Sequence, residues 1–119
     1  MKYTEDHEWL RIEGDLVVVG ITEHAAEQLG DVVFVELPEP ETMVARGDEV
    51  SVIESVKAAS DIAAPLDGEI VEVNDALVAD PSLVNKDATG EGWFFKMKID
   101  DLSALDEYMS EDEYKDFIG

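Results

Sequence analysis

The stretch Val52–Pro65, VIESVKAASDIAAP, predicts a β-hairpin with an isolated lysine in its turn. Residues 52–53 and 60–62 are short alternating segments that can pair antiparallel. The turn then centres on Lys57, whose nearest neighbours in the chain are small or apolar. No other lysine lies between residues 3 and 85, and a lysine on such a turn projects into solvent.

An exposed lysine on a turn has two interpretations, an ordinary surface residue and a point of covalent attachment. The charged ammonium form of an ordinary lysine predominates at pH 7, so acylation requires an enzyme that activates the acyl group and removes the proton. Glu54 and Asp61 flank the lysine and are candidates for orienting such an enzyme by charge. The residues of the hairpin alone leave both interpretations open.

Strand patterns extend from the hairpin in both directions and predict a mostly β chain of one domain. The predicted strands are EWLRIE (8–13), DLVVVG (15–20), DVVFVELP (31–38), GDEVSVIE (47–54), DGEIVEVN (67–74) and GWFFKMKID (92–100). In the last strand, alternation predicts one face of Trp93, Phe95, Met97 and Ile99 and an opposite face of Phe94, Lys96 and Lys98. Burial of the first face would contribute roughly 1.5–3 kcal/mol per fully buried side chain.

Helices are expected to be short. One is predicted between Thr22 as N-cap and Gly30 as the stop. The segment of about 102–118 is expected to hold two more, capped by Ser103 and Ser110. Each of these serines is followed three residues later by an acid, Asp106 or Glu113. In the second helix, the side chains of Tyr114, Phe117 and Ile118 are expected to pack inward.

The charge of the chain is extreme, with 30 acidic against 8 basic residues and a net charge of -22. This balance argues against nucleic acid and anionic membranes as partners. Two explanations remain open, adaptation to high salt and docking onto basic partner surfaces, where complementary charge speeds encounter.

Several functional classes are excluded by what the sequence lacks. There is no cysteine, which excludes a disulfide framework and a thiolate metal site. The longest fully apolar runs are four or five residues, so no membrane span is expected and the cytoplasm is the expected location. The two histidines make no metal signature, and neither a phosphate-binding glycine loop nor a nucleophile–base pair is readable. The sequence therefore predicts no metal site, no catalytic residue and no enzyme activity.

Four motifs resemble those of the glycine cleavage system H-protein family. ESVKAAS resembles its lipoyl-attachment motif. HEWLR at His7, GITEHAAEQLGDVVFVELPEP from Gly20 and GEGWFFKMKI from Gly90 resemble other segments of the family, in its order and spacing. Ordinary lipoyl domains lack GITEHA and GEGW, and biotin carriers usually place methionines beside the lysine. The chain departs from the family at Pro40-Glu41 and Ala88-Thr89, in loops away from the lysine.

The resemblance implies a fold and a cofactor. The implied fold is a barrel-sandwich hybrid, like lipoyl and biotinyl domains, of two small antiparallel sheets with the lysine hairpin between them and short helices that include C-terminal ones. Residues 1–119 would form a single lipoyl-carrier domain, a monomer, whose core hairpin spans about 44–75 and whose C-terminal helical segment spans about 102–118. Lipoate would be bound covalently as N6-lipoyllysine at Lys57.

The resemblance also implies a function, that of a carrier protein in glycine catabolism rather than an enzyme. The lipoyl arm would shuttle an aminomethyl group and reducing equivalents between a PLP-dependent glycine decarboxylase, a folate-dependent aminomethyltransferase and dihydrolipoyl dehydrogenase. A lipoate ligase or lipoyl transferase would attach the arm. A second function stays open, that of a lipoyl donor or relay protein without glycine-cleavage activity.

Finally, the resemblance implies a surface cleft into which the loaded arm folds and which excludes water. Glu8, His24 and Asp61 match the family motifs that would form this cleft, with Glu8 as a carboxylate that holds the cationic amine. From the residues alone, Glu8 is equally a surface acid among thirty, and His24 is equally a partly packed imidazole on a helix.

Overall fold

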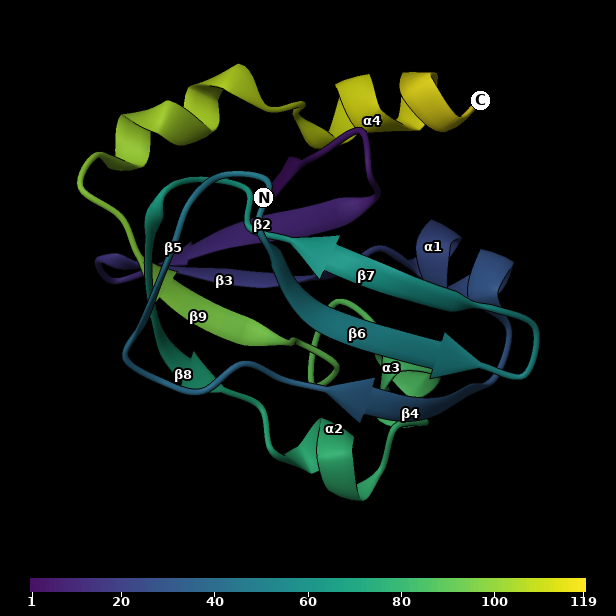
Figure 1. Cartoon of the computed structure of the whole chain (residues 1–119). Helices are drawn as coiled ribbons and strands as arrows, with labels where there is room; N and C mark the ends of the chain where they lie inside the picture. Colours follow the sequence, from purple (N-terminus) through teal and green to yellow (C-terminus); the bar gives the residue numbers. More distant parts are fainter.

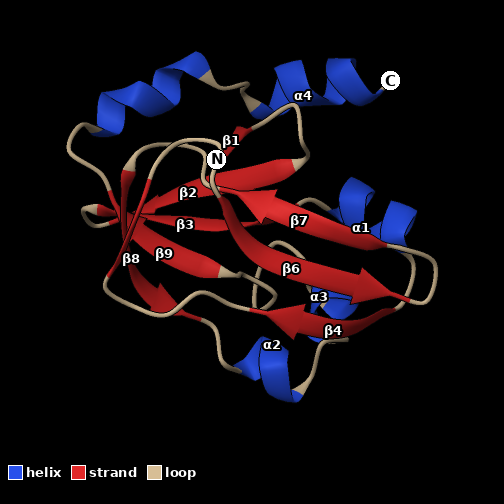
Figure 2. Ribbon diagram, in the orientation of Figure 1, coloured by secondary structure: helices blue, strands red, loops and turns tan.

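The computed structural model describes residues 1–119 as two antiparallel sheets with short helices around them (Figures 1 and 2). The larger sheet has the order β1 (Lys2–Tyr3), β2 (Glu8–Glu13), β3 (Leu16–Ile21), β9 (Phe95–Lys98), β8 (Gly68–Val73) and β5 (Thr42–Val44). The smaller sheet has the order β4 (Val32–Glu36), β6 (Glu49–Ser55) and β7 (Ala59–Ala63). The sheets do not close on themselves, and the predicted mostly β fold of the barrel-sandwich type is confirmed.

The main core lies between the two sheets. Alternate residues of each strand point inward, as a period of two requires, and their side chains are almost completely buried. From the larger sheet these include Val17, Val19, Phe95 and Met97, and from the smaller sheet Val35, Ile53 and Ile62. Both sheets therefore contribute to one continuous core, and the inward face of β6 and β7 is held against the larger sheet.

A second, smaller cluster lies on the other face of the larger sheet, around Trp9. Trp9 is fully buried, and its indole N–H donates a 2.9 Å hydrogen bond to the carbonyl of Ala88. Gly20 lies opposite Trp9 on β3, and a Cβ at Gly20 would come within 2.5 Å of the indole ring. This glycine is therefore required by the close approach of the ring.

The predicted strands and the first helix are largely confirmed. The α1 helix (Glu23–Leu29) begins after Thr22, whose hydroxyl accepts a hydrogen bond from the N–H of Ala25, and it ends at Gly30. Two helices that the sequence did not predict, α2 (Ala76–Ala79) and α3 (Leu83–Lys86), are single turns without a side-chain cap. Leu77 and Val84 are fully buried, so tertiary packing supports these turns. No helix has the length and apolar character that crossing a membrane requires.

The C-terminal segment confirms one predicted helix start and corrects the other. The α4 helix (Glu111–Ile118) begins with the predicted capping box of Ser110 and Glu113. The element before it, η1 (Leu102–Glu107), is a 3₁₀ helix capped by Asp101, which accepts a hydrogen bond from the N–H of Ser103. The prediction of Ser103 as the cap was therefore wrong, because the helix begins after Asp101 and the Ser103 hydroxyl itself donates to the Asp101 carboxylate.

The apolar face of α4 is narrower than predicted. Tyr114 is buried against Tyr3, with the two rings stacked 4.7 Å apart, and Ile118 is half-buried one turn later. Phe117 is 49% exposed, so the prediction that it packs inward was wrong. The helix contacts the short β1 strand along one stripe, and Phe117 lies beside this stripe.

Two further predictions need correction. The strand β9 begins at Phe95 rather than at residue 92, and Phe94 is fully buried instead of facing outward with the lysines. The alternation of side chains between two faces does not apply to Phe94 because this residue lies before the strand begins. The Lys57 hairpin is formed by β6 and β7 within the smaller sheet, not between the two sheets, because β6 pairs with β4 on its other side.

Candidate functional site

The turn between β6 and β7 consists of three residues, Val56, Lys57 and Ala58. The N–H of Ser55 donates a 2.8 Å hydrogen bond to the carbonyl of Ala58. The hydroxyl of Ser55 accepts hydrogen bonds from the N–H groups of Lys57 and Ala58, at 3.2 and 3.1 Å. Within the turn, the serine hydroxyl therefore acts as the acceptor for two backbone N–H groups. The predicted turn over residues 55–58 is confirmed.

The Lys57 side chain is exposed and forms no ion pair. Its stem lies over Gly30, where a Cβ would stand 3.2 Å from Cε and 3.7 Å from Nζ of Lys57. Gly30 has φ +75°, a backbone conformation that favours glycine. The C-terminal end of α1 therefore lies beside the amine, at the outer end of the β6–β7 hairpin (Figure 1).

A small cavity of about 190 Å³ lies beside this hairpin, between β7, α1 and the start of β2. Its apolar wall comes from one face of α1 and from inward residues of three strands, and its rim carries acids. The apolar residues are Ile21, Ala25, Leu29, Ile53 and Ile62, and the remaining lining residues are Asp6, His7, Glu8, Gln28, Ser60 and Asp61. We call this cavity the arm cleft. Its composition suits an aliphatic chain that ends in a cation.

Glu8 is the buried acid of the arm cleft and is only 4% exposed. The hydroxyl of Thr4 lies 3.4 Å from its Oε1 and accepts a 3.1 Å hydrogen bond from the N–H of Glu8, and the N–H of Ala63 also donates to the carboxylate. Burial, and then the negative charge of Asp6, raise the pKa of Glu8 to about 7. Glu8 is therefore poised between its neutral and charged forms near neutral pH, and a cation in the cleft would favour the charged form.

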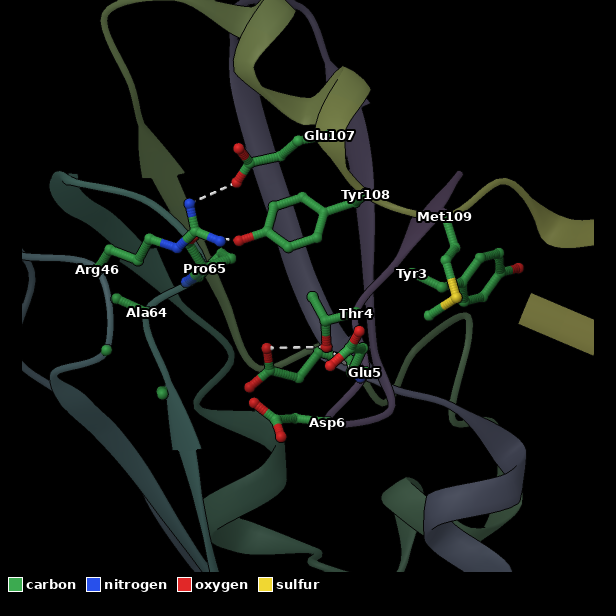
Figure 3. Close-up of a pocket in the computed structure, with 13 residues that line it drawn as sticks. Tyr3, Thr4, Glu5, Asp6, Arg46, Ala64, Pro65, Glu107, Tyr108 and Met109 are labelled. Atoms are coloured by element: carbon green, nitrogen blue, oxygen red, sulfur yellow. Dashed lines mark hydrogen bonds and ion pairs between the residues drawn. The ribbon is translucent and has the colours of Figure 1, made fainter. Parts of the chain in front are cut away.

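A second cavity of about 460 Å³ also has Glu8 in its lining. It extends to Glu107 at the end of η1 (Figure 3). Arg46 forms an ion pair with Glu107 at 2.5 Å and lies over the ring of Tyr108. Tyr108 donates a hydrogen bond to the carbonyl of Pro65. Glu8 and Asp6 line both cavities, so both cavities border the start of β2.

The predicted site residues are brought together only in part. Glu8 and Asp61 both line the arm cleft, with Asp61 exposed at its rim. His24 does not line it, but its ring lies 4.9 Å from the ring of His7, which does. Glu54 is exposed near the base of the hairpin turn, outside the cleft, where it pairs with Phe34 and Ala59 in the sheet.

Sequence reasoning missed His7 and three other polar lining residues, Asp6, Gln28 and Ser60. His7 has φ +67° and its Nδ1 lies 2.8 Å from the hydroxyl of Tyr114, which lies 2.8 Å from the hydroxyl of Thr22. Partial burial, and then His24, lower the pKa of His7. One signal was available for α1, because Ala25, Gln28 and Leu29 have the spacing of a single helix face.

Comparison with known proteins places the chain among relatives of one kind. The sequence model described as "Glycine cleavage H-protein" matches residues 1–119. The chain is 53% identical over 117 residues to the glycine cleavage system H protein of Bartonella tribocorum, covering 98% of this chain and 96% of that protein. It is 55% identical over 118 residues to the glycine cleavage system H protein of Xanthobacter autotrophicus, covering 99% and 94%. The crystal structure of a glycine cleavage system H protein from Mycobacterium marinum superposes with TM-score 0.86 at 42% identity, covering 97% and 93%.

Proposed function

Because the chain belongs to the glycine cleavage H-protein family, whose members are the lipoyl carriers of the glycine cleavage system, we propose that Lys57 is its point of lipoyl attachment. The family is a carrier subunit rather than a catalyst. An exposed lysine in a short hairpin turn is accessible to an acylating enzyme. The single observation that carries this proposal is the projection of this one amine from a rigid hairpin, beside a cleft that suits an arm.

The residues of the arm cleft fit the group. When attached, a lipoyl group supplies a disulfide that accepts an aminomethyl group and electrons. The apolar wall of Ile21, Leu29 and Ile62 suits the hydrocarbon part of the arm, and burial there excludes water. The Glu8 carboxylate stands where it can hold a cationic amine by charge and hydrogen bonding.

The arrangement explains how one arm serves several enzymes. A mobile arm on a rigid turn keeps its reactive end at high local concentration near each partner. We propose that the partners are the PLP-dependent glycine decarboxylase, the folate-dependent aminomethyltransferase and dihydrolipoyl dehydrogenase, with a lipoate ligase or lipoyl transferase as the attaching enzyme. The domain would span residues 1–119, with its core hairpin at about 44–75 and its C-terminal helical segment at about 102–118.

The test of the attachment is the mass of the peptide that contains residue 57. Wild-type protein produced with lipoate and its ligase should show the lipoyl increment on this peptide. The Lys57→Arg variant should lose the increment completely and keep its stability, because the side chain is exposed. An unmodified wild-type peptide under these conditions, or an increment on another lysine, would contradict the proposal.

Glu8→Gln separates the carrier from the alternative of a lipoyl relay. Both functions need the modified lysine, but only the carrier needs a cleft that protects a cationic amine. We expect Glu8→Gln to keep the lipoyl increment and to release the carried amine faster, measured as the rate of formaldehyde and ammonia formation from the loaded protein. A matched Glu54→Gln variant, whose acid lies outside the cleft, should release it at the wild-type rate. Equal rates for wild type and Glu8→Gln would favour the relay.

A further inference from the structure

Three apolar side chains face solvent beside the lysine hairpin, and we call them the bulge patch. They are Val33, Phe34 and Val56, with exposed fractions of 56, 44 and 67%. Phe34 also lines a shallow groove of about 400 Å³ whose other wall includes Val78 of α2. Exposed apolar side chains that gather in one place typically mark an interaction site.

A β-bulge in β4 creates the patch. Val32 pairs with Ser55 and Phe34 pairs with Glu54, so two steps along β4 correspond to one step along β6 and Val33 is the extra residue. A bulge of this kind re-aims side chains and is typical of sheet edges and functional sites. Here it leaves two consecutive apolar residues exposed on the edge strand of the smaller sheet.

The patch adjoins the lysine. The N–H of Val56 donates a 3.0 Å hydrogen bond to the carbonyl of Asp31, the residue before β4. The contact between β4 and the hairpin therefore reaches the residue next to Lys57. Because strand residues rise by about 3.3 Å each, Val33 lies within roughly 10 Å of the turn. Any protein that encloses the Lys57 amine must therefore cover part of the bulge patch.

Unpaired acids surround the patch. Asp31, Glu36 and Glu54 are exposed and take part in no ion pair. The complementary surface on a partner is an apolar contact bordered by lysine or arginine. Such a border would add electrostatic attraction to a chain of net charge -22.

We infer that the bulge patch is the docking surface for the enzyme that acylates Lys57, an inference that rests on the proposed attachment at this lysine.

In the acylation step, the neutral amine of Lys57 attacks the carbonyl carbon of an activated acyl donor such as an acyl adenylate. The amide C–N bond forms, the bond to the leaving group breaks with its electron pair, and the amine proton passes to a base or to water. This enzyme must bring its active site to Nζ itself. Enzymes that use the finished arm meet its far end and have less need of the patch.

Phe34→Ser tests the inference, with Met43→Ser as the matched control. Met43 is 72% exposed on β5 of the other sheet, so it loses a similar apolar surface elsewhere. The unmodified proteins are incubated with a purified lipoate ligase, ATP and lipoate, and intact mass is followed at several protein concentrations. We expect Phe34→Ser to lower kcat/KM for lipoylation about tenfold, as for an anchoring interface residue, and Met43→Ser to change it less than twofold.

Val33→Ser provides a second variant, so that the test does not depend on the folding of one protein; thermal unfolding shows which variants are intact. The inference is overturned if intact patch variants are lipoylated at the wild-type rate or if Met43→Ser is equally impaired. It is also overturned if fully lipoylated Phe34→Ser loses as much activity with glycine decarboxylase as the unmodified variant loses in lipoylation. The patch would then also bind enzymes that react with the finished lipoyl arm. A wild-type dimer that Phe34→Ser dissociates would instead assign the patch to a second copy. In each case, a lipoyl increment on wild-type Lys57 would still support the proposed function.

Discussion

The turn that holds Lys57 and the segment that holds Glu8 are built in opposite ways. Most hydrogen bonds of the turn lie within residues 55–58, with one more from Val56 to Asp31, and its lysine is exposed. Glu8 is buried, and the cavities on which it borders are lined by residues of β7, η1 and the β1–β2 turn. A point of attachment needs only access, which a local structure provides. A carboxyl group with a raised pKa needs removal from water, which requires distant parts of the chain.

The largest effect should come from Glu8→Gln, measured as stability against pH. The pKa of Glu8 is raised from its ordinary 4.5 to about 7, so the folded protein binds this proton more tightly than the unfolded chain. Ionisation of Glu8 therefore lowers stability as pH rises from 4.5 to 7, by about 3 kcal/mol in total. Glutamine cannot ionise and removes this contribution.

Chemical denaturation between pH 4.5 and 8 measures the difference between wild type and Glu8→Gln, in which the pH dependence of all other groups cancels. The difference should shift in favour of the variant as pH rises. Glu54→Gln, at an exposed site near the hairpin, should stay within about 0.5 kcal/mol of wild type throughout. If Glu8→Gln behaves like Glu54→Gln, the contrast between the two regions fails.

The next effect concerns the tight packing next to Glu8. A Cβ at Gly20 would stand 2.5 Å from the buried Trp9 ring, so Gly20→Ala should cost about 2 kcal/mol of unfolding free energy. Gly14→Ala is the control, because its Cβ would meet nothing within 4 Å and only its φ of +64° opposes alanine, by about 1 kcal/mol. Urea denaturation measures both. An equal or smaller cost at Gly20 would mean that the Trp9 region is less rigid than its packing indicates.

The smallest effect should occur at the hairpin turn. Ser55→Ala removes the hydroxyl that accepts from Lys57 and Ala58, at a cost of about 1 kcal/mol. Ser60→Ala, an exposed serine of the same hairpin, should cost less. Both variants should still be lipoylated. A loss well above 2 kcal/mol for Ser55→Ala would show that the turn depends on long-range contacts, as the Glu8 segment does.

The sequence predicted the parts of the fold in which neighbouring residues carry the signal. Thr22 and Gly30 bound α1 as predicted, and Ser110 with Glu113 begins α4. Elements supported by distant contacts were missed, as with the single turns α2 and α3 and the short strands β1 and β5. Ser103 is not the cap because Asp101, another good capping residue, takes that position two residues earlier, a choice that residue preference does not decide.

The strand alternation, the hairpin and the isolated lysine in its turn follow from the sequence alone, because each depends on residues within a few positions of one another. Three other features required the folded structure: the burial of Glu8 near Asp61, the contact of His24 with His7 and the bulge that exposes Phe34. Burial and charge depend on which segments meet in space. Residues separated by more than fifty positions in the chain, such as Glu8 and Asp61, share one cavity only after the sheets have packed.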